Sequence, residues 1–133
     1  MFTNLTVSDA MSQSLFKVKP DDDIIEVVKV MGEQKYTSAM VVDDQGHLVG
    51  IFSDTDGIDA VLKISVDPSF RRKVSEFMTE NPEVVGPSES LVDIAQRFTQ
   101  RRYRRFPVIE NGRLVGLVSR VNVLKQITKL SRL

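Results

Sequence analysis

Two short stretches of the chain repeat one another: GIFSDTD at residues 50–56 and GLVSRVN at residues 116–122. Each has a glycine, two apolar residues, a serine, two variable positions and then Asp56 or Asn122. An apolar run that ends at a serine is typical of a strand followed by a helix, because serine caps helix N-termini. The two stretches therefore predict the same strand-to-helix corner, written twice.

The repetition extends outward from these corners over almost the whole chain. A shift of 67 residues aligns VSDAM at 7–11 with VSEFM at 74–78, and a shift of 66 aligns LVG at 48–50 with LVG at 114–116. Similarity spread over a unit, with a single one-residue gap in a turn, indicates an internal duplication. We expect the first repeat at 5–64, a linker at 65–73 and the second repeat at 74–130.

Each repeat has the pattern of a β-α-β-β-α unit. An extended piece that stops at a proline precedes an amphipathic helix, two short apolar strands and a closing helix that starts at Ser53 or Ser119. The pair Asn111–Gly112 predicts a tight hairpin turn. The expected elements are extended pieces at 16–20 and 82–87, helices at 23–35 and 90–102, strands at 39–42, 48–52, 106–109 and 114–118, and helices from 53 and 119 onward.

The predicted fold class is mixed α/β, of the α+β kind. A three-stranded unit leaves one face of its sheet uncovered, and two such units can cover one another. We therefore expect the two repeats to pack sheet to sheet in a pseudo-twofold arrangement.

The composition excludes several classes of protein. The chain has 133 residues, 41% hydrophobic and 27% charged, which is typical of a globular protein. With no cysteine it has neither disulfides nor thiolate metal sites. No window of 18 apolar residues and no signal peptide is present, so we expect no membrane span and a cytoplasmic location.

The formal net charge is zero, but the charges are unevenly placed. Residues 1–66 hold 11 acidic and 5 basic residues, a balance of −6, whereas residues 67–133 hold 7 acidic and 13 basic residues, a balance of +6. Either the two halves attract each other, within a chain or across a dimer, or the second half receives an anion. The totals leave both interpretations open.

The chemistry of the corners suggests a binding site. Ser53 and Ser119 stand at predicted helix starts, where free backbone N–H groups and the positive end of the helix dipole favour phosphate. A carboxylate one turn into the helix, such as Asp56, can accept both hydroxyls of a ribose. The alternative is structural, since Ser-x-x-Asp is also a helix capping box. Asn122 is the weaker box partner, because it has no charge.

Taken together, the VSDAM and VSEFM starts, the stretch FPVIENGRLVGLVS at 106–119 and the two corners resemble a tandem CBS-domain pair. This module, also called a Bateman module, is named after cystathionine β-synthase, and the likeness covers residues 5 to 130. It implies a stand-alone CBS-domain protein that senses AMP, ADP, ATP or a related adenosine compound in clefts between the two repeats. It also implies a homodimer of such pairs.

The resemblance implies roles for individual residues. The corner serines, Ser53 and Ser119, would contact phosphate or ribose, and Asp56 and Asn122 would hold the ribose hydroxyls. Met40, Val85 and Pro107 are candidates for the wall around the adenine, although the favoured interpretation is that they are core residues where the two sheets meet.

Four arginines, Arg101, Arg102, Arg104 and Arg105, lie between a predicted helix and a predicted strand. The end of the helix dipole accounts for the first two. Arg104 and Arg105 lie beyond the helix, and in the resembling family basic residues here often contact phosphate. The first repeat has Thr37 and Ser38 at these positions, and Asp54 where the second has Arg120. We expect two unequal sites, with the anion bound by Arg104 or Arg105 and by Arg120.

Three function classes follow. The first is a nucleotide-sensing regulator that relays its state to a separate, unidentified partner protein. The second is a dimerisation or scaffold protein with no bound nucleotide. The third, nucleic-acid binding through the stretch RRYRR at 101–105, is disfavoured by the zero net charge. The chain has no nucleophile set, no metal-ligand spacing and no phosphate-binding loop motif, so we expect neither an enzyme nor an obligatory cofactor.

Overall fold

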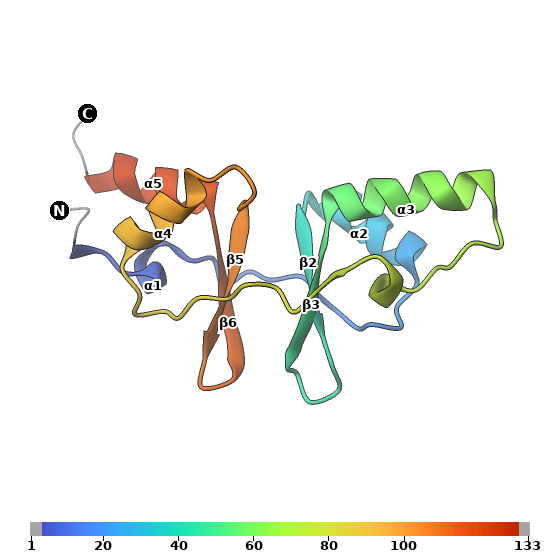
Figure 1. Cartoon of the computed structure of the whole chain (residues 1–133), viewed down its shortest axis with the longest axis horizontal. Coiled ribbons are helices and arrows are strands. Elements are labelled where there is room, and N and C mark those ends of the chain that lie inside the picture. The colour runs from blue at the N-terminus through green and yellow to red at the C-terminus, as the bar shows by residue number, and fades with distance from the viewer. Residues whose placement is uncertain (1–3, 131–133) are drawn as a thin grey trace. The chain divides into compact units, whose positions relative to one another are not determined.

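The computed structural model describes residues 4–130, and these form two compact units. One unit, here called the first-hairpin unit, comprises Phe16–Pro82. The other, the second-hairpin unit, comprises the described residues before Phe16 together with those from Glu83 onward. Each unit is mixed α/β, as the sequence predicts, and each contains one long β-hairpin (Figure 1).

In the first-hairpin unit, two helices cover one face of a four-stranded sheet, with the strands in the order β1-β2-β3-β4 (Figure 1). Strand β1 runs parallel to β2, and the other two pairings are antiparallel. The apolar residues of α2, α3 and the helix-facing side of the hairpin form one core. The elements are β1 Lys17–Val18, α2 Ile24–Gln34, β2 Ser38–Val42, β3 Leu48–Ser53, α3 Asp54–Val66, the 3₁₀ helix η2 Val74–Glu76 and β4 Thr79–Glu80.

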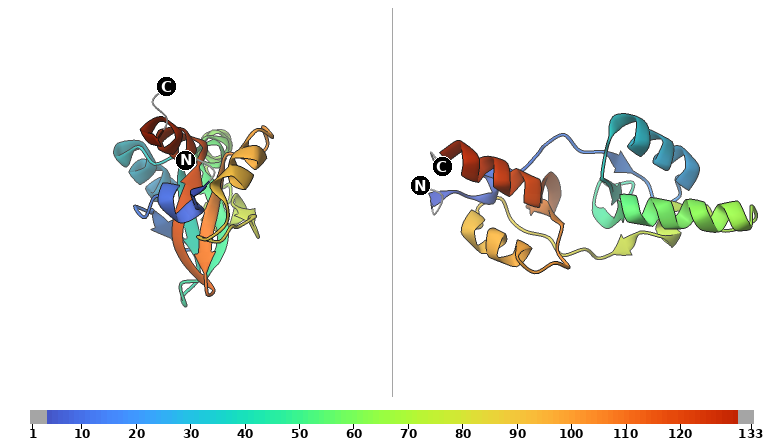
Figure 2. Two further views of the ribbon diagram at one scale, coloured as in Figure 1. Left: turned by 90° about the vertical axis from the view of Figure 1, so that its left-hand side faces the viewer. Right: turned by 90° about the horizontal axis from the view of Figure 1, so that it is seen from above.

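The second-hairpin unit repeats this plan with fewer regular strands. Its hairpin pairs β5 with β6, and α4 lies beside α5 (Figure 2). Single bridges, Val85 with Val108 and Ser12 with Leu117, stand where the other unit has β1 and β4. Asn111 and Gly112 adopt positive φ angles of 51° and 77°, which confirms the tight turn. The elements are α1 Val7–Ala10, α4 Leu91–Phe98, β5 Arg105–Glu110, β6 Arg113–Ser119 and α5 Arg120–Leu130.

The compact units do not coincide with the two repeats read along the sequence. Each hairpin is joined by the segment that leads into the opposite repeat: β4 pairs with β3, and Ser12 bridges Leu117 of β6. The same exchange of segments between the repeats occurs at the starts of α2 and α4. There the N–H of Ile24 donates to the carbonyl oxygen of Arg72, and the N–H of Leu91 donates to that of Leu5. The repeat boundaries stay a prediction, as does the packing of one sheet on the other.

The predicted elements are largely confirmed, with three differences. Helix α4 ends at Phe98, so Arg101 and Arg102 lie in a turn and not at a helix end as expected. The extended piece at 82–87 makes a single bridge and no strand. The short elements α1, η2 and β4 were not predicted, because the side chains of so few residues carry no clear periodicity.

Two glycines allow the exchanged segments to approach the hairpins. A Cβ atom at Gly50 would lie 2.6 Å from the Sδ of Met78 and 2.9 Å from the carbonyl oxygen of Thr79. At Gly116 it would lie 2.6 Å from the Sδ of Met11. The methionines of VSDAM and VSEFM therefore pack directly on the glycines of the two LVG stretches. The matching VS-x-x-M and LVG stretches of the two repeats therefore correspond to the same methionine–glycine contact, which occurs once in each unit.

The substitution Gly50→Ala should lower the free energy of unfolding by about 1–3 kcal/mol, because the added methyl group meets a backbone carbonyl as well as a flexible side chain. The matched control is Gly32→Ala, in α2, where a Cβ atom meets nothing within 4 Å. The control should raise the stability by up to about 1 kcal/mol through helix propensity. Urea unfolding measures both, and equal effects of the two substitutions would contradict the contact.

Arg72, in the predicted linker at 65–73, forms an ion pair with Asp23 at the start of α2. The Nε of Arg72 lies 3.0 Å from Oδ1 of Asp23, and Asp23 also caps α2 by accepting the N–H of Glu26. The hydrogen bond from Arg72 is the main reason why the pKa of Asp23 lies below its usual value, and the N–H of Glu26 adds to it. The ion pair thus holds residues 72 and 23 at the bridge between Asp23 and Lys73.

Because the folded state lowers the pKa of Asp23, its contribution to stability is complete above the unfolded-state pKa of about 3.9. It disappears as the pH falls through the lower folded-state pKa. The stability difference between the wild type and Asp23→Asn should therefore be constant near neutral pH and shrink below about pH 4. Urea unfolding from pH 3 to 7 tests this, with Asp44→Asn, a 95% exposed carboxylate, as control. A difference that grows toward low pH would contradict it.

Candidate functional site

The first corner, at the junction of β3 and α3, is a complete capping box. The N–H of Ser53 donates to Oδ2 of Asp56 at 2.8 Å, and the N–H of Asp56 donates to Oγ of Ser53 at 3.1 Å. Both side chains are half-buried. Ser53 and Asp56 thus form the helix cap that the Ser-x-x-Asp pattern allows. The capping bonds leave Oδ1 of Asp56 and the hydroxyl proton of Ser53 without a partner among the described residues.

The helix start at this corner has no free backbone donor. The N–H of Asp54 donates to the carbonyl oxygen of Thr37 at 2.9 Å, and the N–H of Thr55 donates to Oδ1 of Asp54 at 2.8 Å. With Ser53 and Asp56 paired as well, all four N–H groups from 53 to 56 have partners. This corrects the expectation of free donors at Ser53. The carboxylates of Asp54 and Asp56 already accept the N–H groups of Thr55 and Ser53, so these donors are not available to a phosphate.

The second corner, at the junction of β6 and α5, has the same geometry with an amide in place of the carboxylate. The N–H of Ser119 donates to Oδ1 of Asn122 at 2.8 Å, and the N–H of Asn122 donates to Oγ of Ser119 at 3.3 Å. The Ser119 hydroxyl also donates to Oδ1 of Asn122, at 2.9 Å. Asn122 therefore completes the box, although the sequence marks it as the weaker partner.

The helix start at the second corner is more open to an anion. The N–H of Val121 has no hydrogen-bond partner among residues 4–130, and that of Arg120 makes a long bond of 3.4 Å to the carbonyl oxygen of Arg104. No acidic residue stands in the first turn of α5. The side chains of Arg104 and Arg120 are exposed beside this helix start. A free donor, a helix dipole and two cations thus occur together.

The strand register places one further residue beside each corner serine. Ser38 pairs with Ser53 across the first hairpin, and Arg105 pairs with Ser119 across the second. Directly opposed residues carry their side chains on the same face of a hairpin. Arg105 was predicted as a site residue, whereas Ser38 was only noted as its replacement. The signal for Ser38 was its alignment with Arg105.

The three apolar candidates fall into two groups. Val85 belongs to the core of the second-hairpin unit, which favours packing as its role. Met40 and Pro107 are also buried, but neither belongs to the core formed on the helix side of its hairpin. Alternation along the strands places Met40 on the face of Ser38, and Pro107 on the face of Arg105. These two therefore remain candidates for a ligand wall.

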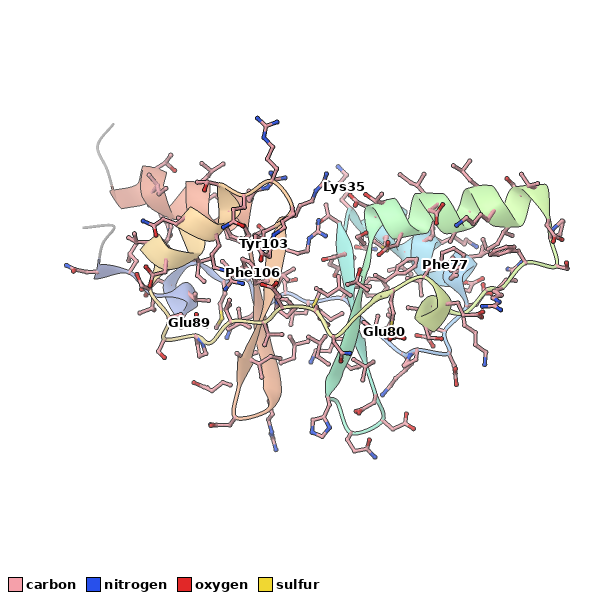
Figure 3. The ribbon with its side chains drawn as sticks, in the orientation of Figure 1. Lys35, Phe77, Glu80, Glu89, Tyr103 and Phe106 are labelled. Carbon is pink, nitrogen blue, oxygen red and sulfur yellow. The ribbon has the colours of Figure 1, made fainter. Side chains whose placement is uncertain are left out.

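The turn that carries the arginines is braced by a cluster of aromatic and charged side chains (Figure 3). The Tyr103 hydroxyl donates to Glu83 at 3.1 Å, and Glu83 also accepts from Arg97. The guanidinium of Arg97 lies 4.2 Å from the centre of the Phe106 ring, and that of Arg102 lies 4.6 Å from the centre of the Tyr103 ring. This cluster fixes the backbone just before Arg104 and Arg105.

The described part of the chain offers few alternatives to these corners. It contains no group of three or more His, Asp or Glu side chains placed to hold a metal ion. Within residues 4–130, no helix is both long enough and apolar enough to cross a membrane. The candidate site residues thus remain those at the two corners and on the hairpin faces beside them.

Comparison with known proteins agrees with this duplicated architecture. The family model of the CBS domain matches the chain twice, at residues 7–63 and 74–129. The chain belongs to the CBS-domain family. It is a tandem CBS pair, as the resemblance of its motifs implied.

Relatives and solved structures are similar over most of the chain. The chloroplastic CBS domain-containing protein CBSX2 of Arabidopsis thaliana is 28% identical over 155 aligned positions, which cover 96% of this chain and 65% of the relative. An uncharacterized protein of Methanocaldococcus jannaschii is 27% identical over 92% of the chain and 42% of its own length. The chain therefore spans less than two thirds of the length of these curated relatives.

Among solved structures, CBSX2 in complex with AMP has a TM-score of 0.85 and 32% identity, and the match covers 97% of this chain and all of that one. A CBS-domain containing protein of Agrobacterium tumefaciens has a TM-score of 0.79 and 29% identity, with 94% of this chain covered and 96% of the other. These matches show that the fold of the pair is preserved.

Proposed function

We propose that this CBS pair is a regulatory module that binds an adenine nucleotide and relays its bound state to a separate partner protein. The observation that carries the proposal is the second corner, where a helix start with a free N–H group meets exposed arginines. The AMP complex of CBSX2, which is 32% identical, supports adenine nucleotides as the ligand class. AMP, ADP and ATP are the candidates.

Each residue of the second corner has a role in this proposal. Arg104 and Arg120 attract the phosphate, and the N–H of Val121 donates to one of its oxygens. Asn122 donates to a ribose hydroxyl through its Nδ2 amide group, because Oδ1 already accepts two hydrogen bonds from Ser119. Pro107 lies against the base. The predicted location of these ligands, in clefts between the two repeats, stays part of the proposal.

The regulatory role follows from binding rather than from chemistry. A ligand that binds one arrangement of the two repeats better than another shifts the population between them, and a partner protein that contacts the repeats detects the shift. We infer that the chain is not an enzyme, since its candidate residues are suited to binding alone. A cytoplasmic location stays a prediction, and the named relative CBSX2 is chloroplastic.

A scaffold function is the alternative, and one observation favours it. Both corners form complete capping boxes from their own residues, so capping by itself accounts for Ser53, Asp56, Ser119 and Asn122. A scaffold would keep these residues for helix stability alone. Direct binding measurements separate the two functions.

The double substitution Arg104→Ala/Arg120→Ala should lower AMP affinity by about 10- to 100-fold, because each lost charge-assisted hydrogen bond contributes about 1.5–3 kcal/mol and part of that attraction is screened. Isothermal titration calorimetry measures the change. The control is Arg113→Ala, which removes the same charge at the turn end of β6 and should leave affinity unchanged. If the wild type binds no AMP, ADP or ATP at millimolar concentration, the scaffold function is favoured.

We also propose that two copies of the pair associate through the outer faces of α3 and α5. On α3, the side chains of Ile58, Leu62 and Val66 are 64%, 62% and 87% exposed and recur every four residues. A hollow of about 330 Å³ between α2 and α3 lies beside them. Helix α5 exposes Val121 and Leu124 in the same way.

The charges of the two helices favour a second copy of this chain as the occupant. Helix α3 carries three aspartates and one lysine, whereas α5 carries one arginine and two lysines and no acidic residue. An α3 face of one copy therefore attracts an α5 face of another, while two α3 faces repel. Apolar stripes between complementary charges are typical of self-association.

The substitution Leu62→Glu should convert the dimer into a monomer, because it places a charge in the middle of the apolar stripe of α3. Light scattering coupled to size-exclusion chromatography gives the mass directly. Gln34→Glu adds the same charge on α2, outside the residues that line the hollow, and should leave the dimer intact. A Leu62→Glu variant that stays dimeric would contradict this interface.

A further inference from the structure

The first corner contains a buried hydroxyl without a partner. The side chain of Ser38 is 6% exposed, and its Oγ makes no hydrogen bond with any residue in 4–130. Native structures contain few buried polar groups of this kind, and each calls for an explanation. Because Ser38 pairs with Ser53 across the hairpin, the hydroxyl lies next to the capping box at the start of α3.

Other polar atoms at this corner also keep unused bonding capacity. Ser53 Oγ accepts the N–H of Asp56, and its own proton has no acceptor among the described residues. Asp56 accepts the N–H of Ser53 through Oδ2, so Oδ1 is available. Two hydroxyl donors and one carboxylate acceptor thus occur together. This set is suited to the vicinal hydroxyls of a sugar, each of which both donates and accepts.

The charge at this corner opposes a phosphate. Residues 35–38 and 53–56 contain Lys35, Asp54 and Asp56, a balance of −1. The equivalent residues of the second repeat, 102–105 and 119–122, contain four arginines and no acid, a balance of +4. Lys35 is exposed and lies three residues before Ser38, at the end of α2 (Figure 3). In addition, every N–H group at the start of α3 is already bonded.

We propose that the first corner binds an uncharged nucleoside, with Ser38 Oγ and Asp56 bonded to its ribose, while the second corner binds the phosphorylated form. The assignment of the base as adenine rests on the proposed function. Ser38 then determines the specificity: a neutral hydroxyl stands where the other repeat has Arg105. A chain with two such corners responds to the nucleoside and to the nucleotide separately.

The test measures adenosine and AMP binding by calorimetry. In the Arg104→Ala/Arg120→Ala background, AMP affinity should fall by the same factor of about 10 to 100, while adenosine still binds with unchanged affinity at one site per chain. Adding Ser38→Ala should then lower adenosine affinity by about 3- to 10-fold, the usual effect of one lost neutral hydrogen bond. The same substitution should raise the melting temperature of the unliganded protein, because an unsatisfied buried hydroxyl is removed. Ser65→Ala, on the same unit in α3, is the control and should leave adenosine affinity unchanged.

A second variant tests the charge argument at an exposed position. Asp54→Arg gives the first corner the residue that Arg120 supplies to the second, without altering a buried side chain. We expect AMP to bind this variant at two sites per chain and the wild type at one. An unchanged stoichiometry would overturn the role of charge in the discrimination.

The remaining outcomes separate this inference from the proposed function. If neither adenosine nor AMP binds the wild type, the proposed function fails and the inference fails with it. If AMP binds and adenosine merely competes for the arginine-dependent site, the inference alone is overturned. The same holds if Ser38→Ala raises the melting temperature and leaves adenosine affinity unchanged, since the hydroxyl would then have no ligand.

Discussion

The close approach of a methionine-bearing segment to a glycine in the second strand of each hairpin is the constraint on which the fold depends. Each glycine leaves room for a segment that leads into the opposite repeat, Met78 and Thr79 at Gly50 and Met11 and Ser12 at Gly116. Because the segments are exchanged, neither repeat forms a complete unit from its own consecutive residues. The chain therefore folds as an interdependent pair, and a change in one repeat affects the unit built around the other hairpin.

The corners combine a capping role that the structure shows with the binding role proposed for the same residues. A capping box satisfies the backbone at a helix start, and under the proposed function the side-chain atoms that remain unbonded are the ones that bind the ligand. At the first corner, carboxylates of the chain satisfy the donors and occupy the positive end of the helix dipole. At the second corner, an amide does the capping without adding charge, so the dipole and the arginines stay available to an anion.

Much of this architecture could be predicted from the sequence, because duplication makes each feature visible twice. The hairpin at Asn111–Gly112, the helix starts at Ser53 and Ser119 and the unequal charges at Asp54 and Arg120 were all predicted from residue types and their spacing. The exchange of the lead segments could not be, since it depends on pairings between residues 28 to 105 positions apart, from Ile51 with Thr79 to Ser12 with Leu117. Ser38 was noted only as the replacement of Arg105, because the sequence does not show that its hydroxyl is buried and has no hydrogen-bond partner within residues 4–130.

The two corners could diverge in charge because the contacts that hold them are made by the backbone. The N–H of Asp54 bonds to the carbonyl oxygen of Thr37, and the N–H of Arg120 bonds in the same way to the carbonyl oxygen of Arg104. These contacts use only an N–H and a carbonyl group, so the same corner forms with threonine and aspartate in one repeat and with two arginines in the other. The capping pair uses its side chains and therefore varies less. It is Ser53 with Asp56 in one repeat and Ser119 with Asn122 in the other, a carboxylate against an amide of the same shape. The two repeats thus share a frame held by main-chain bonds and differ in the side chains around it, which is the difference in charge on which the proposed difference in ligands depends.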